Sequence, residues 1–378
     1  MDLRHSPEVE AFRAEARAWL RAHVPTVPLP SLETREGFAA HHTWEAELHA
    51  DGWSVVSWPQ EFGGRGLDIM HWLVLEEEYY AAGAPGRVSQ NGINLLAPTL
   101  FDHGTAEQRA RVLPAMASGQ TIWAQAWSEP ESGSDLASLR SVAERTDGGW
   151  LLSGQKTWSS RAAFADRAFG LFRSEPGLPK PHQGLTYLMF DLRAPGVTVR
   201  PIGRLDGKPA FAELFLDQVF VPDEDVIGAP GQGWRVAMST AGNERGLTLR
   251  SPGRFLASAQ RLAALWRESG DPELAPRVAD ALIGARAYQL FTYANASRFA
   301  AGAEIGAESS LNKVFWSEFD IALHETALDL LGPEAELASG PWAESWVFSL
   351  AGPIYAGTNE IQRDIIAERL LGLPKGRR

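Results

Sequence analysis

Two segments combine hydroxyl residues, glycine and tryptophan in a pattern that suits an electron-rich ligand. Residues 127–136 form a run of Ser, Glu and Gly after Trp127, and their backbone N–H groups and hydroxyls can donate to an acceptor. Residues 154–160 place Trp158 between hydroxyl residues at the end of an expected strand. Taken singly, each segment is more typical of an ordinary loop or strand. Together they indicate a ligand site.

A third segment, residues 355–363, runs from Tyr355 into an apolar helix. Thr358 is predicted to be its N-cap, and the free amides at such a helix start can face a phosphate or a flavin. The competing interpretation is a capped surface helix with one buried face.

Composition excludes several kinds of chemistry. The chain has no Cys, which rules out disulfides, thiolate metal sites and a cysteine nucleophile. Its net charge of −12 argues against nucleic acid or an anionic membrane as the main partner. The histidines are scattered, so no metal site is expected. No secretory signal is found, and the longest uncharged stretch, residues 112–128, is broken by Pro, Gly and Gln residues, which predicts a cytoplasmic protein without membrane spans.

Periodicity predicts three domains in the order helices, strands, helices: residues 1–121, 122–230 and 231–378. Helical spacing follows Ser6-Pro7 and recurs over 44–52, 69–82 and 106–118. Short apolar runs bounded by turn residues predict strands near 150–152, 168–172, 186–190, 197–199 and 212–221. The predicted fold class is α+β multidomain, with an N-terminal helical bundle, a middle antiparallel β-sandwich or barrel, and a C-terminal four-helix bundle.

Four motifs along the chain give it a family resemblance. Their order and approximate spacing resemble the flavin-dependent acyl-CoA dehydrogenases, whose architecture has the same helix–strand–helix order. The resemblance implies a noncovalent FAD and an acyl thioester that is desaturated between its α and β carbons. The motifs are Trp58-Pro-Gln-Glu-Phe-Gly-Gly64, Glu129-Pro130 to Asp135, Gly154-Gln-Lys-Thr-Trp158 and Gly357-Thr-Asn-Glu-Ile-Gln362.

The resemblance also implies roles for individual residues. On the substrate side it implies Ser134, which lies where the family's loop touches the pantetheine arm, and Arg245, Tyr355, Ala356 and Gly357. The FAD-binding residues that it implies are Gln125, Trp127, Ser128, Gly133, Ser134, Trp158, Ser160, Thr358 and Glu360.

The catalytic base is expected at an alternative position. Many family members carry a Glu directly after the Tyr of the C-terminal motif, but this chain has Ala356 there. Another branch carries the base on the first helix after the β domain, just before an Arg, and Glu244-Arg245 stands at that place. Glu244 is therefore predicted to be the base, whereas an isolated Glu is more often a solvated carboxylate. Arg245 is expected to orient the substrate or to support local structure.

Two departures from the family concern the half of the flavin site that a neighbouring subunit supplies. Residues 256–276 lack the Arg-x-x-Phe-Gly element, and Leu331-Gly332-Pro333 replaces an expected Gly-Gly turn. The preferred explanation is a bacterial branch with a modified site for bulky acyl groups, such as a steroid side chain. The other is a mixed assembly whose partner subunit completes the pocket.

The expected partners follow from the resemblance. They are an acyl-CoA or carrier-protein thioester from lipid metabolism, an electron-transfer flavoprotein as electron acceptor, and further subunits in a homotetramer or dimer, with a hetero-oligomer as the alternative. Two other functions stay open at this point. One is a noncatalytic or half-site subunit, and the other is a flavin oxidase or monooxygenase on the same fold.

Overall fold

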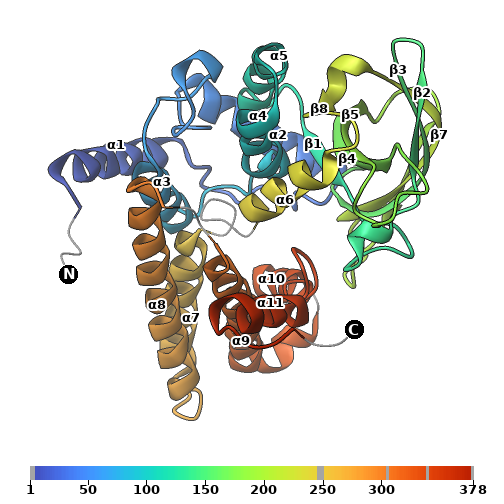
Figure 1. Ribbon diagram of the computed structural model, residues 1–378. Helices are drawn as coiled ribbons and strands as arrows, with labels where there is room; N and C mark the ends of the chain where they lie inside the picture. The colour runs from blue at the N-terminus through green and yellow to red at the C-terminus, as the bar shows by residue number, and fades with distance from the viewer. Residues whose placement is uncertain (1–4, 245–250, 304–305, 338–339, 376–378) are drawn as a thin grey trace. The chain divides into compact units, whose positions relative to one another are not determined.

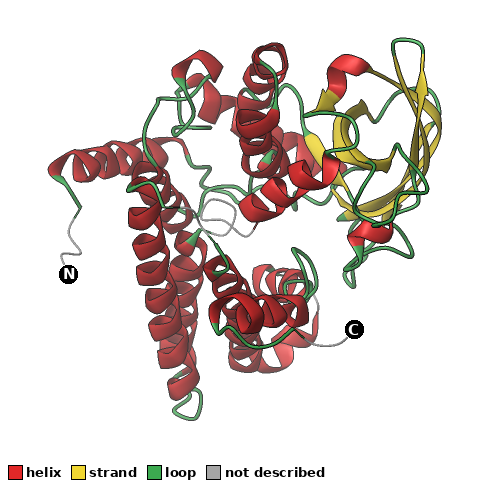
Figure 2. Ribbon diagram, viewed as in Figure 1, coloured by secondary structure: helices red, strands yellow, loops and turns green. Residues whose placement is uncertain are grey.

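The computed structural model describes residues 5–244, 251–303, 306–337 and 340–375 (Figures 1 and 2). Contacts between Cα atoms divide the chain into two units. The first unit comprises residues 1–26, 67–84 and 245–378, and the second comprises residues 27–66 and 85–244. These units combine separate stretches of the chain, whereas the predicted domains are continuous stretches. The predicted boundaries at residues 121 and 230 therefore stay a prediction.

The second unit contains an eight-stranded sheet with the order β6-β7-β3-β2-β4-β5-β8, in which β1 also pairs with β4. Most neighbours are antiparallel, as the sequence predicts. The exceptions are β1 with β4 and one residue pair between β2 and β4, which are parallel. The strands are β1 (Trp123–Ala126), β2 (Val142–Thr146), β3 (Gly149–Ser160), β4 (Arg167–Arg173), β5 (Leu185–Asp191), β6 (Val197–Ile202), β7 (Phe211–Pro222) and β8 (Val226–Ile227).

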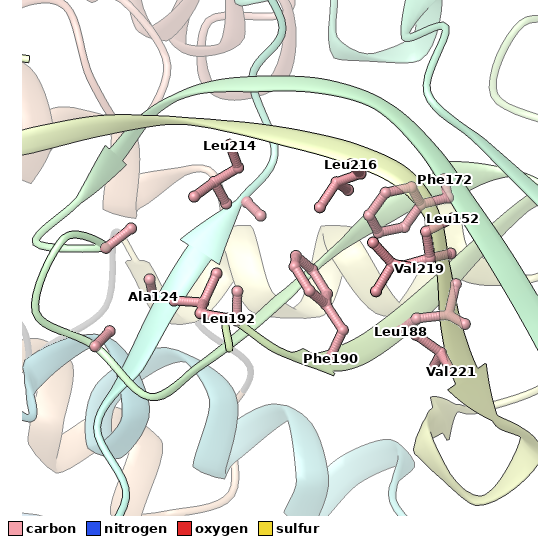
Figure 3. Close-up of a cluster of buried hydrophobic side chains, with 14 of the residues drawn as sticks. Ala124, Leu152, Phe172, Leu188, Phe190, Leu192, Leu214, Leu216, Val219 and Val221 are labelled. Atoms are coloured by element: carbon pink, nitrogen blue, oxygen red, sulfur yellow. The ribbon is translucent and has the colours of Figure 1, made fainter. Parts of the chain in front are cut away.

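Apolar side chains of this sheet converge in one core, shown in Figure 3. Phe172, Phe190 and Leu214 are among its buried members. Strand β5 is buried along six consecutive residues, which is typical of a strand that is covered on both faces. The alternating burial of β7 instead marks a strand with one solvated face.

The second unit contains helices as well as this sheet. Helix α5 begins with a capping box formed by Thr105 and Gln108. Helix α6 starts against β5, because a Cβ atom at Gly233 would lie 2.7 Å from the carbonyl oxygen of Leu185. The helices are α2 (Arg35–Ala50), η1 (Gln60–Phe62), the π-helix η2 (Gly92–Leu96), α4 (Ala97–His103), α5 (Ala106–Ala117), η3 (Leu136–Ser138), η4 (Asp223–Asp225) and α6 (Gly233–Glu244).

The described part of the first unit is helical, and Figure 1 shows its helices α7 and α8 running side by side. Phe255, Tyr288 and Trp316 belong to its buried core. Its helices are α1 (Pro7–His23), α3 (Ile69–Ala81), α7 (Pro252–Ser269), α8 (Ala275–Ala300), α9 (Glu308–Leu331), η5 (Gly332–Leu337), α10 (Pro341–Ser349), α11 (Asn359–Ile365) and the π-helix η6 (Ile366–Leu370).

Charged side chains join α1 to α3 inside this unit. Arg13 contacts Glu77 at 3.1 Å and Glu78 at 3.0 Å, and Arg17 contacts Glu78 at 2.7 Å. Burial raises the pKa of Glu78, but the two guanidinium groups outweigh that effect and lower it below the ordinary value. No helix in the described ranges is both long and apolar enough to cross a lipid bilayer.

Candidate active site

Strand β1 and the residue after it carry two of the predicted flavin contacts. The amide nitrogen Nε2 of Gln125 is buried and has no hydrogen-bond partner among the described residues. The indole Nε1 of Trp127 donates to the Tyr187 hydroxyl at 3.1 Å. A buried amide without a partner is costly, so Gln125 is a donor that a bound ligand can satisfy.

The loop after β1 is held at its base and exposed at its tip. Glu129 and Ser132 exchange two backbone hydrogen bonds of 2.9 and 3.0 Å, which makes a tight turn. The Glu129 carboxylate accepts from the backbone amides of Arg140 at 2.6 Å and Ser141 at 2.9 Å. Gly133 and Ser134 are exposed, so the anchored loop presents these two residues to solvent.

A buried lysine explains why this loop stays in place. The Lys156 side chain is fully buried, and its Nζ donates to Glu129 Oε1 at 2.8 Å and to the carbonyl oxygen of Leu171 at 2.7 Å. Burial lowers the pKa of Lys156 to about 8, with the Glu129 charge opposing the shift. Burial raises the pKa of Glu129, but the Lys156 charge and the hydrogen bonds outweigh it and hold the pKa below 4.5. Both groups are therefore charged at neutral pH. Lys156 lies within the motif of residues 154–158, but nothing in the neighbouring sequence indicates that it pairs with Glu129.

Strand β3 presents Trp158 in an unusual backbone conformation. The register between β3 and β7 shifts between Lys156 and Ser159, and Trp158 has φ = 59°. Its side chain is 60% exposed, although a large aromatic residue is normally buried. A left-handed non-glycine residue at a β-bulge is a strained arrangement that is common beside functional sites. At this bulge the indole is largely exposed and contacts the Phe211 ring in an edge-to-face arrangement, with 5.9 Å between the ring centroids.

The end of β3 supplies further polar groups. The Ser159 hydroxyl is buried and has no hydrogen-bond partner among the described residues. The carbonyl oxygen of Ser160 accepts from Asn91 Nδ2 at 3.5 Å. The Thr157 amide donates to the carbonyl oxygen of Ser128 at 2.9 Å, which joins the β1 loop to β3.

The C-terminal motif of the first unit forms a fixed turn before α11. Ala356 and Gly357 both have left-handed backbones, with φ = 58° and 78°. Gln362 Nε2 donates to their carbonyl oxygens at 3.0 and 3.3 Å. Thr358 caps the helix through a 3.3 Å bond from the Ile361 amide, which confirms the predicted N-cap.

Buried and exposed carboxyl and amide groups flank this cap. Asn359 Oδ1 accepts from Lys313 Nζ at 2.8 Å and from the Ser317 hydroxyl at 3.0 Å. Hydrogen bonds from its own backbone amide and from Thr358 lower the pKa of the exposed Glu360. Asn359, the residue after the cap, is thus held by side chains of α9.

The structure brings seven of the predicted flavin residues into the second unit and leaves the others in the first. The other two, Thr358 and Glu360, belong to the first unit, and so do the predicted substrate residues Tyr355, Ala356 and Gly357. The backbone of Glu244 ends α6, but its side chain lies outside the described part of the structure, and so does the whole of Arg245. The seven residues of the second unit are Gln125, Trp127, Ser128, Gly133, Ser134, Trp158 and Ser160.

Sequence reasoning missed Tyr187, which bonds to Trp127 in the second unit. Its signal is a buried phenol hydroxyl in a mostly apolar strand that also contains Thr186 and Asp191. Among the described residues, no group of three His, Asp or Glu side chains is arranged to hold a metal ion.

Comparison with known proteins identifies the family. The acyl-CoA dehydrogenase N-terminal domain matches residues 6–120, the middle domain matches 124–219 and the C-terminal domain matches 231–371. The chain therefore belongs to the acyl-CoA dehydrogenase family of oxidoreductases. Acyl-CoA dehydrogenase IpdE1 of Mycobacterium tuberculosis is 38% identical over 383 residues, which cover 97% of this chain and 98% of the relative.

Two solved structures share the fold over the whole chain. The Tcur3481-Tcur3483 steroid ACAD has a TM-score of 0.87 and 27% sequence identity. The ChsE4-ChsE5 complex from Mycobacterium tuberculosis has a TM-score of 0.84 and 28% identity. Both matches cover 100% of this chain and of the other.

The residues present fit the flavin that this family implies. Gln125 Nε2 and the Ser159 hydroxyl are buried polar atoms without partners in the described structure. Trp158 offers an exposed aromatic surface, and Ser134 an exposed hydroxyl. A ligand with a flat π-system and several hydrogen-bonding atoms uses all of these groups.

Proposed function

We propose that the chain is an FAD-dependent dehydrogenase that desaturates the α–β carbon bond of an acyl thioester. The observation that carries the proposal is the strained, exposed Trp158 beside the anchored Ser134 loop, in a chain of the acyl-CoA dehydrogenase family. When bound, FAD supplies a two-electron acceptor for the hydride that leaves the β carbon.

The protein's part in cofactor binding is to hold and orient. In this proposal Trp158 and Trp127 lie against the flavin with their aromatic rings. Gln125, Ser128 and Ser160 surround it with polar groups. Gly133 has no side chain that would stand between the loop backbone and a ligand, and packing within the protein does not require glycine there, since a Cβ atom would meet nothing within 4 Å. Thr358 and Glu360 contribute from the helix start of the first unit.

Proton removal is assigned to Glu244. The α C–H bond breaks, its proton passes to the Glu244 carboxylate, and the electron pair forms the new double bond as hydride departs from the β carbon. Ala356 stands where the commoner base would be and cannot accept a proton. A thioester α C–H is a weak acid, so the base needs a pKa raised by desolvation and the enolate oxygen needs hydrogen bonds. Arg245 is proposed to orient the substrate.

The substrate class is proposed to be bulky, ring-bearing acyl thioesters, carried on CoA or on a carrier protein. The 27% identical solved structure of a steroid ACAD supports this choice. Ser134, Tyr355, Ala356 and Gly357 are the proposed substrate contacts, and the small Ala356 leaves room that a glutamate would fill. An electron-transfer flavoprotein is the proposed acceptor of the electrons.

Assembly is proposed to complete the flavin site. Every copy of this chain lacks the Arg-x-x-Phe-Gly element, so a homotetramer or dimer must draw these flavin contacts from other residues of the second copy, whereas a different partner subunit can bring the element itself. The mixed assembly is supported by the two solved relatives, each of which pairs two differently named proteins.

The test of this function is the variant Glu244→Gln. It removes the proton acceptor and keeps the side-chain volume, so we expect the anaerobic rate of flavin reduction to fall by at least about 100-fold. FAD content should not change. The measurement is stopped-flow bleaching with a panel of straight-chain and ring-bearing acyl-CoA thioesters, followed by a peroxide assay on admission of air.

Glu47→Gln is the matched control, because Glu47 is an exposed helical carboxylate of the second unit. Bleaching of Glu244→Gln at the rate of the control would refute the assignment of the base. A colourless wild-type protein would favour a noncatalytic subunit, and stoichiometric peroxide would favour an oxidase.

A further inference from the structure

A chain of buried hydroxyl groups crosses the second unit from β1 to α4. Trp127 Nε1 donates to the Tyr187 hydroxyl at 3.1 Å, and this hydroxyl lies 3.3 Å from Thr240 Oγ1 on α6. Thr240 Oγ1 lies 2.7 Å from Thr99 Oγ1, which donates to the carbonyl oxygen of Leu95 at 2.7 Å. We call Trp127, Tyr187, Thr240 and Thr99 the hydroxyl relay.

The relay is deeply buried. Tyr187, Thr240 and Thr99 are all 0% exposed, so each hydroxyl depends on protein partners. Phe at 187 or Val at 240 would fill nearly the same space in an apolar setting. Burying three hydroxyl groups costs free energy unless they hydrogen-bond to each other. Their mutual hydrogen bonds therefore favour this one arrangement of the elements that carry them.

Counting hydrogens gives the relay a direction. Thr240 also lies 3.1 Å from the carbonyl oxygen of Val236, yet each threonine has only one hydrogen to donate. If Thr99 keeps its short bond to Leu95, the hydrogen between the two threonines must come from Thr240. Thr240 then accepts from Tyr187. Donation therefore runs from Trp127 through Tyr187 and Thr240 to Thr99 and ends on Leu95 of the π-helix η2.

Two members of the relay lie next to functional positions of the proposed mechanism. Trp127 follows the β1 strand that is proposed to contact the flavin. Thr240 precedes position 244 by four residues on α6, which is about one helical turn. Helix α6 therefore has a fixed hydrogen-bonded distance to β1, through β5, one turn before the proposed base.

We infer that Tyr187 and Thr240 are positioning residues that hold α6 in register with β1 and thereby set the place of Glu244 relative to the flavin strand. The inference rests on the proposed function for its catalytic meaning, but the coupling of α6 to β1 stands on geometry alone. Displacing a base from its working geometry by a small distance is enough to slow catalysis strongly.

The first test needs neither substrate nor activity. Tyr187→Phe and Thr240→Val each break the relay, so we expect amide hydrogen exchange across residues 233–243 and 95–103 to rise by about fivefold or more in the full-length protein. Thr326→Val is the matched control: Thr326 is a buried helical threonine that donates to the carbonyl oxygen four residues earlier, as Thr240 can, but lies in α9. Unchanged exchange in both relay variants would overturn the inference.

The second test asks whether the coupling reaches the chemistry. Thr240→Val should lower the rate of flavin reduction by about tenfold at unchanged FAD content, whereas Thr240→Ser, which keeps the hydroxyl, should restore it. An α-deuterated thioester should show a larger isotope effect in Thr240→Val, because proton removal becomes slower. Equal rates in the Val and Ser variants would overturn the positioning role.

The two tests separate the two proposals. If wild-type flavin is not reduced by any thioester in the panel, the proposed function fails and the hydrogen-exchange result still decides the coupling. If wild-type flavin is reduced but the relay variants match Thr326→Val in both measurements, the function stands and the inference fails.

Discussion

At the scale of single residues, the proposed site combines two kinds of side chain. Some pair with each other inside the protein, and others are exposed on the loop and strand that these pairs hold in place. Lys156 and Glu129 are buried against each other, and the loop that they anchor leaves Ser134 exposed. Trp158 is exposed because its own backbone is left-handed. The exposed groups are the proposed ligand contacts, and the buried pair is their support.

The Lys156–Glu129 pair should make a large contribution that is visible on removal of one partner. Lys156→Met leaves a buried carboxylate without its counter-charge, so we expect the free energy of unfolding to fall by about 3 kcal/mol. Urea unfolding at pH 7 measures the change. The double variant Lys156→Met with Glu129→Gln should recover part of the loss because no charge is left unpaired.

The same pair predicts a pH dependence. The pKa of Glu129 is depressed in the folded chain, so its contribution is fully present above the ordinary value of 4.5 and is lost as pH falls through the depressed pKa. A Lys156→Met variant within about 0.5 kcal/mol of the wild type at pH 7 would contradict the role given to this pair.

At the scale of elements, the proposed functional residues lie mainly at turns and bulges and less in regular helices and strands. The β3 bulge turns Trp158 outward, and the left-handed pair Ala356-Gly357 sets the start of α11. Helix α11 is seven residues long before the π-helix η6 continues it. So short an element has little intrinsic stability and depends on its cap and on α9.

Removing the cap of α11 should therefore weaken it locally. We expect Thr358→Ala to reduce the free energy of unfolding by about 1 kcal/mol, since an N-cap hydroxyl satisfies an otherwise free amide. Thermal and urea unfolding measure it. Thr43→Ala is the control, because Thr43 is exposed within α2 and its hydroxyl donates to the carbonyl oxygen of Ala39, away from any helix start. Equal losses of unfolding free energy in Thr358→Ala and Thr43→Ala would contradict a stabilising role of the cap.

At the scale of the whole molecule, the proposed flavin residues come from both units of the chain. Seven lie in the second unit, and Thr358 and Glu360 lie in the first. A ligand that binds only the folded chain stabilises it by mass action. Cofactor binding and folding stability are thus linked in this proposal.

We expect free FAD at 100 times its dissociation constant to raise the free energy of unfolding by about 2.7 kcal/mol over the deflavinated protein. Trp158→Ala should abolish most of that gain. The exposed indole contributes little to folding, so the apoprotein variant should stay within about 0.5 kcal/mol of the wild type. Denaturant titrations with and without FAD provide the measurement. A full FAD-dependent gain in Trp158→Ala would exclude this residue from the flavin site.

The sequence by itself determined the local elements and the family. Apolar spacing predicts α3, α5, β4, β5 and β7 to within a residue or two, because periodicity records which face of an element is buried. For β3 and β6 the apolar runs 150–152 and 197–199 mark only part of strands that extend over 149–160 and 197–202. The spacing predicts the start of α2 less well, since Thr34 caps that helix ten residues ahead of Trp44. The N-cap at Thr358 was readable because capping depends on a few adjacent residues.

Only the tertiary structure decided which distant residues meet. The parallel pairing of β1 with β4, the burial of Lys156 against Glu129, and the contact of Trp127 with Tyr187 and then Thr240 join positions far apart in the chain. The sequence contains every one of these residues but no local signal of their contacts. Such contacts depend on how the sheet closes around its core and on which buried polar atoms then find partners.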